Sequence, residues 1–232
     1  SAYDRTQRRR IVDESNELLQ GVRDHVGDYD VGCETSTVVS HRSFDELFDI
    51  ARRKDADLTV IGWGENQPWS AIRTERPLTE LTSRLPSDFL VLRERALDES
   101  RVLLPVARSP HADLSAEVVA SLQQTVGSAV TLLHVVDGAG EREAGETFLA
   151  EWAAERGLGD ADLVVDDSGD VEAAIAREAR DKSLLVIGAT ERGLFTRLVT
   201  GSLHLGVVEE VDCSVLIAER ATGYGILRRL FG

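Results

Sequence analysis

The sequence predicts an α/β fold organised around a doubly wound, parallel sheet of five strands. Short apolar runs of strand length alternate with amphipathic stretches of helix length, as in successive strand–helix–strand units. Two of these runs, Leu58–Ile61 and Leu184–Ile187, are apolar at nearly every position and are followed by a glycine. Runs of this kind are typical of parallel strands that helices cover on both faces.

The first half of the chain is expected to contain three strands and three helices. Residues 5–26 carry apolar side chains at helical spacing among charged ones. Ser43 and Glu46 fit a capping box at the start of a second helix. A charged stretch at 94–100 then predicts a linker. The helices are expected at 5–26, 43–54 and 78–85, and the strands at 31–39, 58–61 and 89–92.

The second half is expected to form a complete unit of five strands and four helices. Its first strand is the run RVLLPV, which starts at Arg101, and Asp170 is available as the N-cap of a helix. The strands are expected at 101–106, 129–136, 163–165, 184–187 and 214–218, and the helices at 113–125, 141–156, 171–179 and 198–211.

The two halves resemble each other. Residues 55–62 (DADLTVIG) align with 181–188 (DKSLLVIG) at an offset of 126, and 88–95 (DFLVLRER) align with 213–220 (CSVLIAER) at an offset of 125. Similar offsets in two separated blocks indicate an internal repeat. The first copy lacks a counterpart of the opening strand–helix–strand, which we expect to have been cut away or to lie upstream in a longer parent chain. The expected organisation is a partial domain at 1–95, a complete domain at 101–219 and a tail at 220–232.

The charge balance excludes one class of partner. The chain has 41 acidic and 26 basic residues, a net charge of −15, and Lys54 and Lys182 are its two lysines. Nucleic acid would be repelled by this charge. An acidic, lysine-poor surface predicts a protein from a salt-accumulating organism, because high salt screens its self-repulsion. The alternative is an acidic domain from an ordinary organism. No apolar run approaches the roughly 20 residues that a membrane-spanning helix needs.

No arrangement of side chains predicts catalysis or metal binding. Cys33 and Cys213 lie in or beside strand-like runs and suit small buried residues better than a disulfide framework. The five histidines show no paired spacing, so no metal site is expected. Neither the Gly-x-Ser-x-Gly turn of serine hydrolases nor a Gly-x4-Gly-Lys-Ser/Thr phosphate loop occurs. The chain is therefore not expected to be an enzyme.

A loop motif follows the strand at 184–187. Its spacing from Gly188 to Gly201-Ser202 resembles the phosphate loop of the universal stress protein family, Gly-x2-Gly-x9-Gly-Ser/Thr, with Glu191 in place of the middle glycine. The resemblance implies a Rossmann-like fold and, in the ATP-binding branch, an Asp after the first strand where this chain has Ala107. The site residues that it implies, as a degenerate nucleotide loop, are Val106, Ala107, Gly188, Thr190, Arg192, Gly201 and Ser202.

The two departures weaken the case for a nucleotide. A glutamate near a polyanion costs about 1 kcal/mol at 4 Å in bulk water and more when partly buried. Glu191 and Arg192 could instead pair with each other in a plain strand-to-helix turn, and binding of another anion is a further alternative. We therefore expect no cofactor, with ATP or ADP as the alternative.

One subgroup is more closely similar. The segments VVSHRSFDELFDIARR and GATERGLFTRLVTGS, with the glycine loop at Trp63, resemble the cytoplasmic C-terminal region of haloarchaeal amino-acid permeases of the APC type. The resemblance implies a non-catalytic regulatory region in the cytoplasm, at the inner face of the cell membrane, whose partner is the transporter domain of the same chain. It also implies a homodimer through the last strand, Ser214–Ala218. The alternative is a free-standing universal stress protein that binds ATP or another adenine nucleotide.

Overall fold

A computed structural model describes residues 5–29, 31–37, 43–62, 86–107, 113–188 and 210–221. Contacts divide the chain into two compact units, Ser1–His41 and Arg42–Gly232. The boundary falls well before the charged stretch at 94–100, because strands from both sides of that stretch belong to the second unit.

The first unit contains the helix α1 (Arg5–Gly27), which confirms the helix predicted at 5–26. Arg10 pairs with Glu14 one turn later at 2.6 Å, and Arg23 Nε donates a hydrogen bond of 2.7 Å to Thr35 Oγ1. The strand predicted at 31–39 is wrong for residues 31–37, which form no regular structure; the last two positions lie outside the described residues. Within the unit Ser1–His41 the described residues contain no other strand for this segment to pair with, and an isolated strand is not stable.

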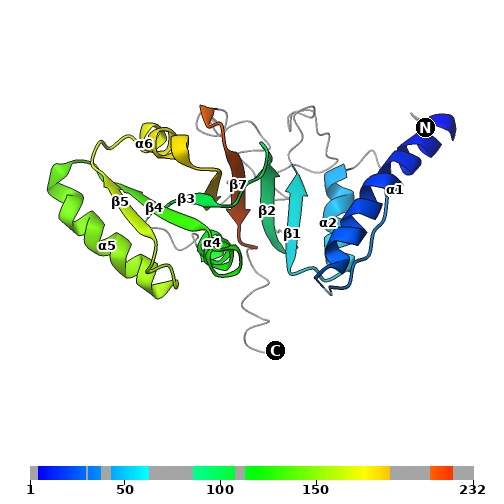
Figure 1. The fold of residues 1–232 in the computed structure, drawn as a ribbon, viewed down its shortest axis with the longest axis horizontal. Coiled ribbons are helices and arrows are strands. Elements are labelled where there is room, and N and C mark those ends of the chain that lie inside the picture. The colour runs from blue at the N-terminus through cyan, green and yellow to red at the C-terminus, as the bar shows by residue number, and fades with distance from the viewer. Residues whose placement is uncertain are drawn as a thin grey trace. The chain divides into compact units, whose positions relative to one another are not determined.

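The second unit is built on a sheet of seven strands, ordered β1-β2-β7-β6-β3-β4-β5 (Figure 1). Neighbouring strands are parallel except β2 and β7, which are antiparallel. The predicted α/β class is confirmed. The sheet has seven strands rather than five because two strands of the first half join the five of the second. The strands are β1 (Leu58–Gly62), β2 (Asp88–Arg93), β3 (Arg101–Pro105), β4 (Ala129–Val135), β5 (Asp162–Asp166), β6 (Leu184–Gly188) and β7 (Ser214–Glu219).

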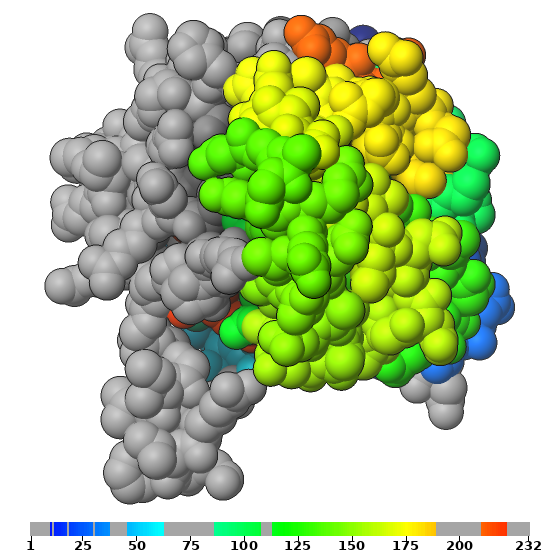
Figure 2. Space-filling model, turned by 90° about the vertical axis from the view of Figure 1, so that its left-hand side faces the viewer, coloured from blue at the N-terminus to red at the C-terminus, as the bar shows by residue number. Residues whose placement is uncertain are grey.

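Helices cover both faces of this sheet. One buried cluster joins the sheet to α4 and α5, and the other joins it to α2 and α6. Seen from the β5 end, α5 and α6 lie at the front of the coloured part of the molecule (Figure 2). The helices predicted at 78–85 and 198–211 lie outside the described residues, apart from Glu210 and Val211. The helical elements of this unit are α2 (Ser43–Arg53), α4 (Asp113–Val126), η2 (Ala139–Glu141), α5 (Arg142–Glu155), α6 (Val171–Glu178) and η3 (Ala179–Asp181).

The two copies of the repeat share one strand register. Leu58 pairs with Asp88 in the first copy, and Leu184 pairs with Ser214 in the second, so a single offset of 126 relates both strand pairs. The offset of 125 predicted for the last strand is wrong by one residue. A slip of one residue turns every side chain of a strand to the opposite face. At an offset of 125, residues of β2 that pack in one buried cluster would therefore correspond to residues of β7 that pack in the other.

Reciprocal hydrogen bonds join the two copies where β2 meets β7. Arg95 N donates to Ser214 Oγ, and Ala221 N donates to Asp88 Oδ1, both at 2.9 Å. At the offset of 126, each donor and each acceptor is the counterpart of the other. The junction therefore has an approximate two-fold symmetry.

The same junction corrects the route that was predicted for a homodimer. The last strand, β7, pairs with β6 on one side and with β2 on the other, so neither edge is free. Pairing of Ser214–Ala218 with a second chain is excluded in this structure, because the first half of the same chain already occupies that edge.

Candidate functional site

The sheet reverses its winding direction between β3 and β6. From β3 the chain proceeds outward to β4 and β5, then returns to form β6 on the other side of β3. In open α/β sheets, ligands bind beside the carboxyl ends of the strands at this switch point. Val106 and Ala107 leave β3 there, and Gly188 ends β6. The fold thus brings together the described residues of the predicted site.

Hydrogen bonds hold Val106 firmly in place. Its N–H donates to Leu133 O at 2.7 Å, and its carbonyl accepts a hydrogen bond of 2.8 Å from His134 Nδ1. The buried His134 ring also packs against Phe148, with 4.7 Å between ring centroids. His134 was not among the predicted site residues; the available signal was an ionisable residue within the otherwise uncharged run of β4. His134 orients the end of β3 and is not placed as a ligand.

The described part of this site does not fit an adenine nucleotide held through a carboxylate. Ala107 is half-buried and presents a methyl group where the family resemblance implied an Asp. Gly188 is buried beside Ala218 of β7. The helix that follows β3 begins at Asp113, whose negative charge opposes an anion at that helix end, although Arg156 pairs with it at 3.0 Å.

The remaining predicted site residues cannot be placed. Thr190, Arg192, Gly201 and Ser202 lie outside the described residues, as does Glu191. Their roles stay predictions.

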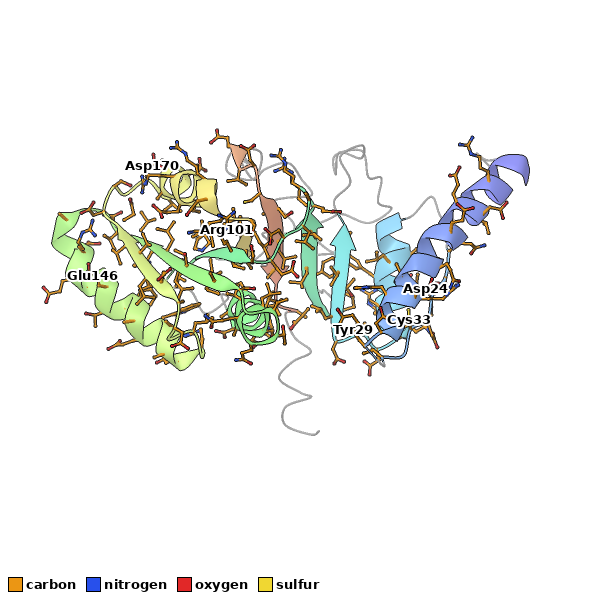
Figure 3. The ribbon with its side chains drawn as sticks, in the orientation of Figure 1. Asp24, Tyr29, Cys33, Arg101, Glu146 and Asp170 are labelled. Atoms are coloured by element: carbon orange, nitrogen blue, oxygen red, sulfur yellow. The ribbon has the colours of Figure 1, made fainter. Side chains whose placement is uncertain are left out.

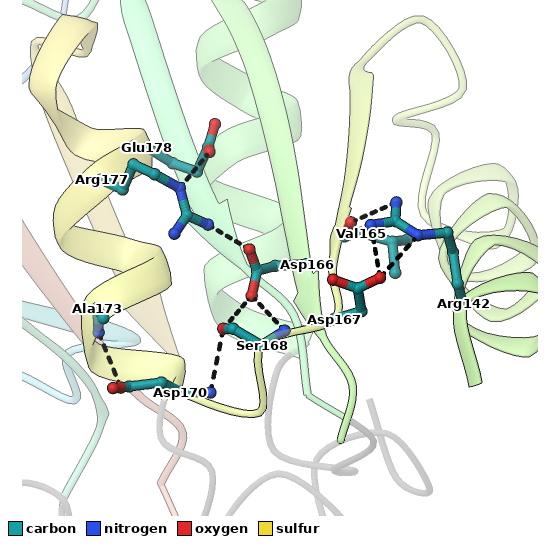
Figure 4. Close-up of polar contacts among 9 residues, drawn as sticks. All are labelled: Arg142, Val165, Asp166, Asp167, Ser168, Asp170, Ala173, Arg177 and Glu178. Atoms are coloured by element: carbon teal, nitrogen blue, oxygen red, sulfur yellow. Dashed lines mark hydrogen bonds and ion pairs between the residues drawn. The ribbon is translucent and has the colours of Figure 1, made fainter. Parts of the chain in front are cut away.

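A polar network closes the loop after β5 (Figure 4). Asp166 accepts hydrogen bonds from the hydroxyl and the N–H of Ser168 and pairs with Arg177. The hydroxyl and amide of Ser168, with a smaller contribution from Arg177, lower the pKa of the Asp166 carboxyl below its ordinary value of 3.8. Asp170 Oδ1 accepts from Ala173 N at 3.0 Å, which confirms the predicted N-cap of α6.

The first residue of α5 is tied to the same loop. Arg142 of α5 pairs with Asp167 at 3.0 Å and donates to Val165 O, also at 3.0 Å. Because these charged groups pair with one another, the network is better suited to hold the β5–α6 loop than to bind a ligand.

The outer surface of α4 has a hollow of about 670 Å³ that reaches the end of α5. Arg156 is one of its lining residues; its guanidinium lies 4.5 Å from the centre of the Trp152 ring and pairs with Asp113 and Glu155. Glu117, also in the lining, pairs with Arg220 at 2.6 Å. Glu146 of α5 points outward, away from the sheet (Figure 3). The hollow is a surface ion-pair network, and its lining contains no histidine, cysteine or lysine among the described residues.

Two further observations concern only the described residues. No group of three His, Cys, Asp or Glu side chains among them is arranged to hold a metal ion. None of their helices is long and apolar enough to cross a membrane.

Comparisons with known proteins agree with this architecture. The model of the "Universal stress protein family" matches residues 100–219. A universal stress protein from Archaeoglobus fulgidus DSM 4304 is 14% identical and has a TM-score of 0.62, over 95% of this chain and 81% of that chain. The cytoplasmic domain of a prokaryotic cation chloride cotransporter is 12% identical with a TM-score of 0.63, over 94% and 82% of the two chains. At these identities the structures show a shared fold. No curated protein matches the sequence.

Proposed function

The chain belongs to the Universal stress protein family, and we propose that it is a non-catalytic regulatory module of a membrane transporter. In this proposal the module lies in the cytoplasm at the inner face of the cell membrane, and its partner is the transporter domain of the same polypeptide. The transported solute is an amino acid or a related solute moved together with a cation.

The observation that carries this proposal is a structural likeness to the cytoplasmic domain of a transporter. The cytoplasmic domain of the cation chloride cotransporter matches 94% of this chain, so the likeness reaches well beyond the family match at 100–219. The shared fold includes the strands of the first half as well as the complete second half. The universal stress protein compared above matches 95% of this chain, so the extent of the fold alone is compatible with both settings. The transporter setting is supported by this likeness together with the resemblance of VVSHRSFDELFDIARR and GATERGLFTRLVTGS to segments of the permeases.

The proposed domain organisation is a partial domain at 1–95, a complete domain at 101–219 and a tail at 220–232. The equal strand registers of the two copies and the reciprocal hydrogen bonds from Arg95 and Ala221 support two domains in tandem. The antiparallel pairing of β2 with β7 joins the two domains into one sheet. A module of this kind is suited to transmit a change in one domain to the other.

The polar groups at β4 and after β5 support a non-catalytic function. His134 is engaged with a backbone carbonyl, and the acidic residues of the β5 loop are paired with Arg142 and Arg177. A general base or nucleophile would need to reach a substrate atom directly.

The second candidate function is that of a free-standing stress protein that binds an adenine nucleotide. It is favoured by the meeting of Val106 and Ala107 with Gly188 at the switch point between β3 and β6. It is disfavoured by the methyl group of Ala107, which cannot accept a hydrogen bond from a sugar or a base.

Immunoblotting of the source cells distinguishes the two candidates. With an antibody raised against the 232-residue chain, the transporter proposal expects a membrane-bound band far larger than the chain itself, released only by detergent. A soluble band of the size of the 232-residue chain would overturn the proposal and favour the free-standing alternative. The recombinant chain, added to washed membranes and recovered, controls for non-specific attachment.

A further inference from the structure

The hollow on the outer surface of α4 is a groove that follows one face of the helix. Its lining residues on α4 lie three or four positions apart, which places them on the same side of successive turns. At about 1.5 Å per residue, they extend over about 17 Å of the helix. Two are alanines, whose small side chains leave room above the helix. The α4 residues of the groove are Asp113, Ala116, Glu117, Ala120, Ser121 and Gln124.

This groove carries an excess of negative charge. Its lining contains three carboxylates and one guanidinium, that of Arg156, so its net charge is −2. Arg156 pairs with both Asp113 and Glu155, whose side chains are still 52% and 73% exposed. The third carboxylate, that of Glu117, is 57% exposed and shares Arg220 with another acidic residue at the start of β2. The carboxylates of the groove therefore outnumber the arginines that pair with them.

Two buried donors beside the groove have no acceptor among the described residues. The guanidinium of Arg156 stacks over the ring of Trp152, and Trp152 is only 5% exposed. Neither Trp152 Nε1 nor Arg156 Nε has a hydrogen-bond partner in the described part of the chain. Both groups can only donate, and buried donors in native proteins are nearly always paired. This end of the groove is therefore suited to a partner that brings acceptors, as the carbonyl groups of a polypeptide do.

Residues 222–232 carry a charge that is complementary to the groove. This segment, TGYGILRRLFG, lies outside the described residues; it contains Arg228 and Arg229 and no acidic residue. Arg220, two positions before it, pairs with Glu117 of the groove at 2.6 Å. The chain from Arg220 to Arg228 reaches at most about 29 Å, which exceeds the length of the groove. Both arginines of the segment can therefore reach the carboxylates of the groove.

We propose that the groove of α4 is the docking surface for residues 222–232 of the same chain. Arg228 and Arg229 pair with the carboxylates of the groove, and their methylene stems lie over Ala116 and Ala120. Because the segment is tethered beside the groove, its effective concentration is about millimolar, and weak single ion pairs are enough to hold it. An anionic membrane surface would also attract a segment of arginines and apolar residues, but the charge of the groove and the contact of Arg220 favour docking within the chain. The proposal does not depend on the transporter assignment.

A nitroxide label at the end of the segment tests the docking by nuclear magnetic resonance. The label is attached to Gly232→Cys in a Cys33→Ser background, because Cys33 is exposed and Cys213 is buried. We expect the amide signals along the groove to lose about half of their intensity or more. The signals of α6, which packs on the opposite face of the sheet, should stay sharp. Replacing both arginines, Arg228→Glu with Arg229→Glu, should reduce the broadening about twofold or more. Broadening that is absent, or that this replacement leaves unchanged, would overturn the proposal.

Matched charge variants on α5 check that the groove is the docking surface. Glu155→Arg reverses a carboxylate of the lining, so it should weaken the broadening by the unaltered segment and restore it for the segment with both glutamates. Glu151→Arg, one turn earlier on α5, exposed and outside the lining, should leave the broadening unchanged. Equal effects of the two α5 variants would contradict the proposal. If α4 shows no broadening and the labelled chain sediments with vesicles of phosphatidylglycerol, the segment binds a membrane and the proposal is wrong.

Discussion

Removing the Arg220 side chain should loosen the junction between the two repeats. Arg220 follows β7 of the second copy and pairs with Asp88 at 2.9 Å, at the start of β2 in the first copy. It also pairs with Glu117 of α4 at 2.6 Å. One side chain thus joins three elements that are far apart in the sequence.

The structure sets the expected size of the effect. The side chain of Arg220 is 34% exposed and that of Asp88 is 21% exposed, whereas Glu117 is 57% exposed. A hydrogen bond to a charged group contributes about 1.5–3 kcal/mol, and an exposed ion pair less than about 1 kcal/mol. We expect Arg220→Ala to lower the free energy of unfolding by about 2 kcal/mol. Asp88→Ala should cost slightly more, because Ala221 N also loses its acceptor.

Urea unfolding at constant salt measures this effect. With a slope of about 2 kcal/mol per molar urea, the midpoint should fall by about 1 M in Arg220→Ala. Arg52→Ala is the matched control, because its pair with Asp49 lies on one helix with both side chains about 40% exposed (41% and 39%); it should cost no more than about 0.5 kcal/mol. The double variant of Asp88→Ala and Arg220→Ala should lose less stability than the sum of the two single variants, because both remove the same ion pair. Equal midpoints for Arg220→Ala and Arg52→Ala would refute the reasoning.

Four further predictions concern ligand binding, thiol reactivity, salt and acid. Calorimetry should detect at most millimolar binding of ATP by the chain and tighter binding by Ala107→Asp combined with Glu191→Gly; micromolar binding by the unaltered chain would contradict this. Ellman's reagent should react quickly with the exposed Cys33 and with Cys213 only after unfolding, because burial raises the pKa of the Cys213 thiol; two fast thiols in the native protein would be the contrary result. The melting temperature should rise from about 0.1 M to about 2 M KCl, because salt screens the repulsion that arises from the net charge of −15. Equal melting temperatures would reject a halophilic protein. Since the folded pKa of Asp166 is lowered, its contribution to stability is present above about pH 4 and is lost as the pH falls through the folded value. In Asp166→Asn the free energy of unfolding should therefore fall less steeply as the pH is lowered below about 4. An unchanged pH dependence would count against the Ser168 contacts.

Most of the fold of the second half follows from local sequence patterns. The apolar runs that became β3, β4 and β6 are bounded by turn residues, and their parallel pairing needs no information beyond the alternation with helices. Two features depended on contacts that no local pattern encodes. The segment 31–37 has the composition of a strand but no strand beside it among the described residues of its own unit, and the apolar β7, which was expected to pair with a second chain, pairs with β2.

The register of the last strand shows a second limit. Aligning 88–95 with 213–220 matches the final Glu-Arg of both segments, and this identity favours the offset of 125 when only the sequences are compared. In the sheet, side-chain direction decides the alignment, and Phe89 and Val91 face the same cluster as Val215 and Ile217. Burial therefore selects the offset of 126.

The candidate site was only partly predictable. The sequence placed Val106, Ala107 and Gly188 at strand ends, and parallel pairing then brought them to one edge. The contact between His134 and Val106 was not predictable, because it joins two residues 28 positions apart through a ring that the strand pattern alone marks as buried.

Isotope-filtered nuclear Overhauser spectra give the most direct test of the central claim, that β7 is paired by β2 of its own chain. We predict backbone contacts between Val91 and Ile217 and between Leu92 and Leu216 in uniformly labelled protein. In a mixture of labelled and unlabelled chains, these contacts should remain within the labelled chain. Contacts between the β7 strands of a labelled and an unlabelled chain would contradict the account.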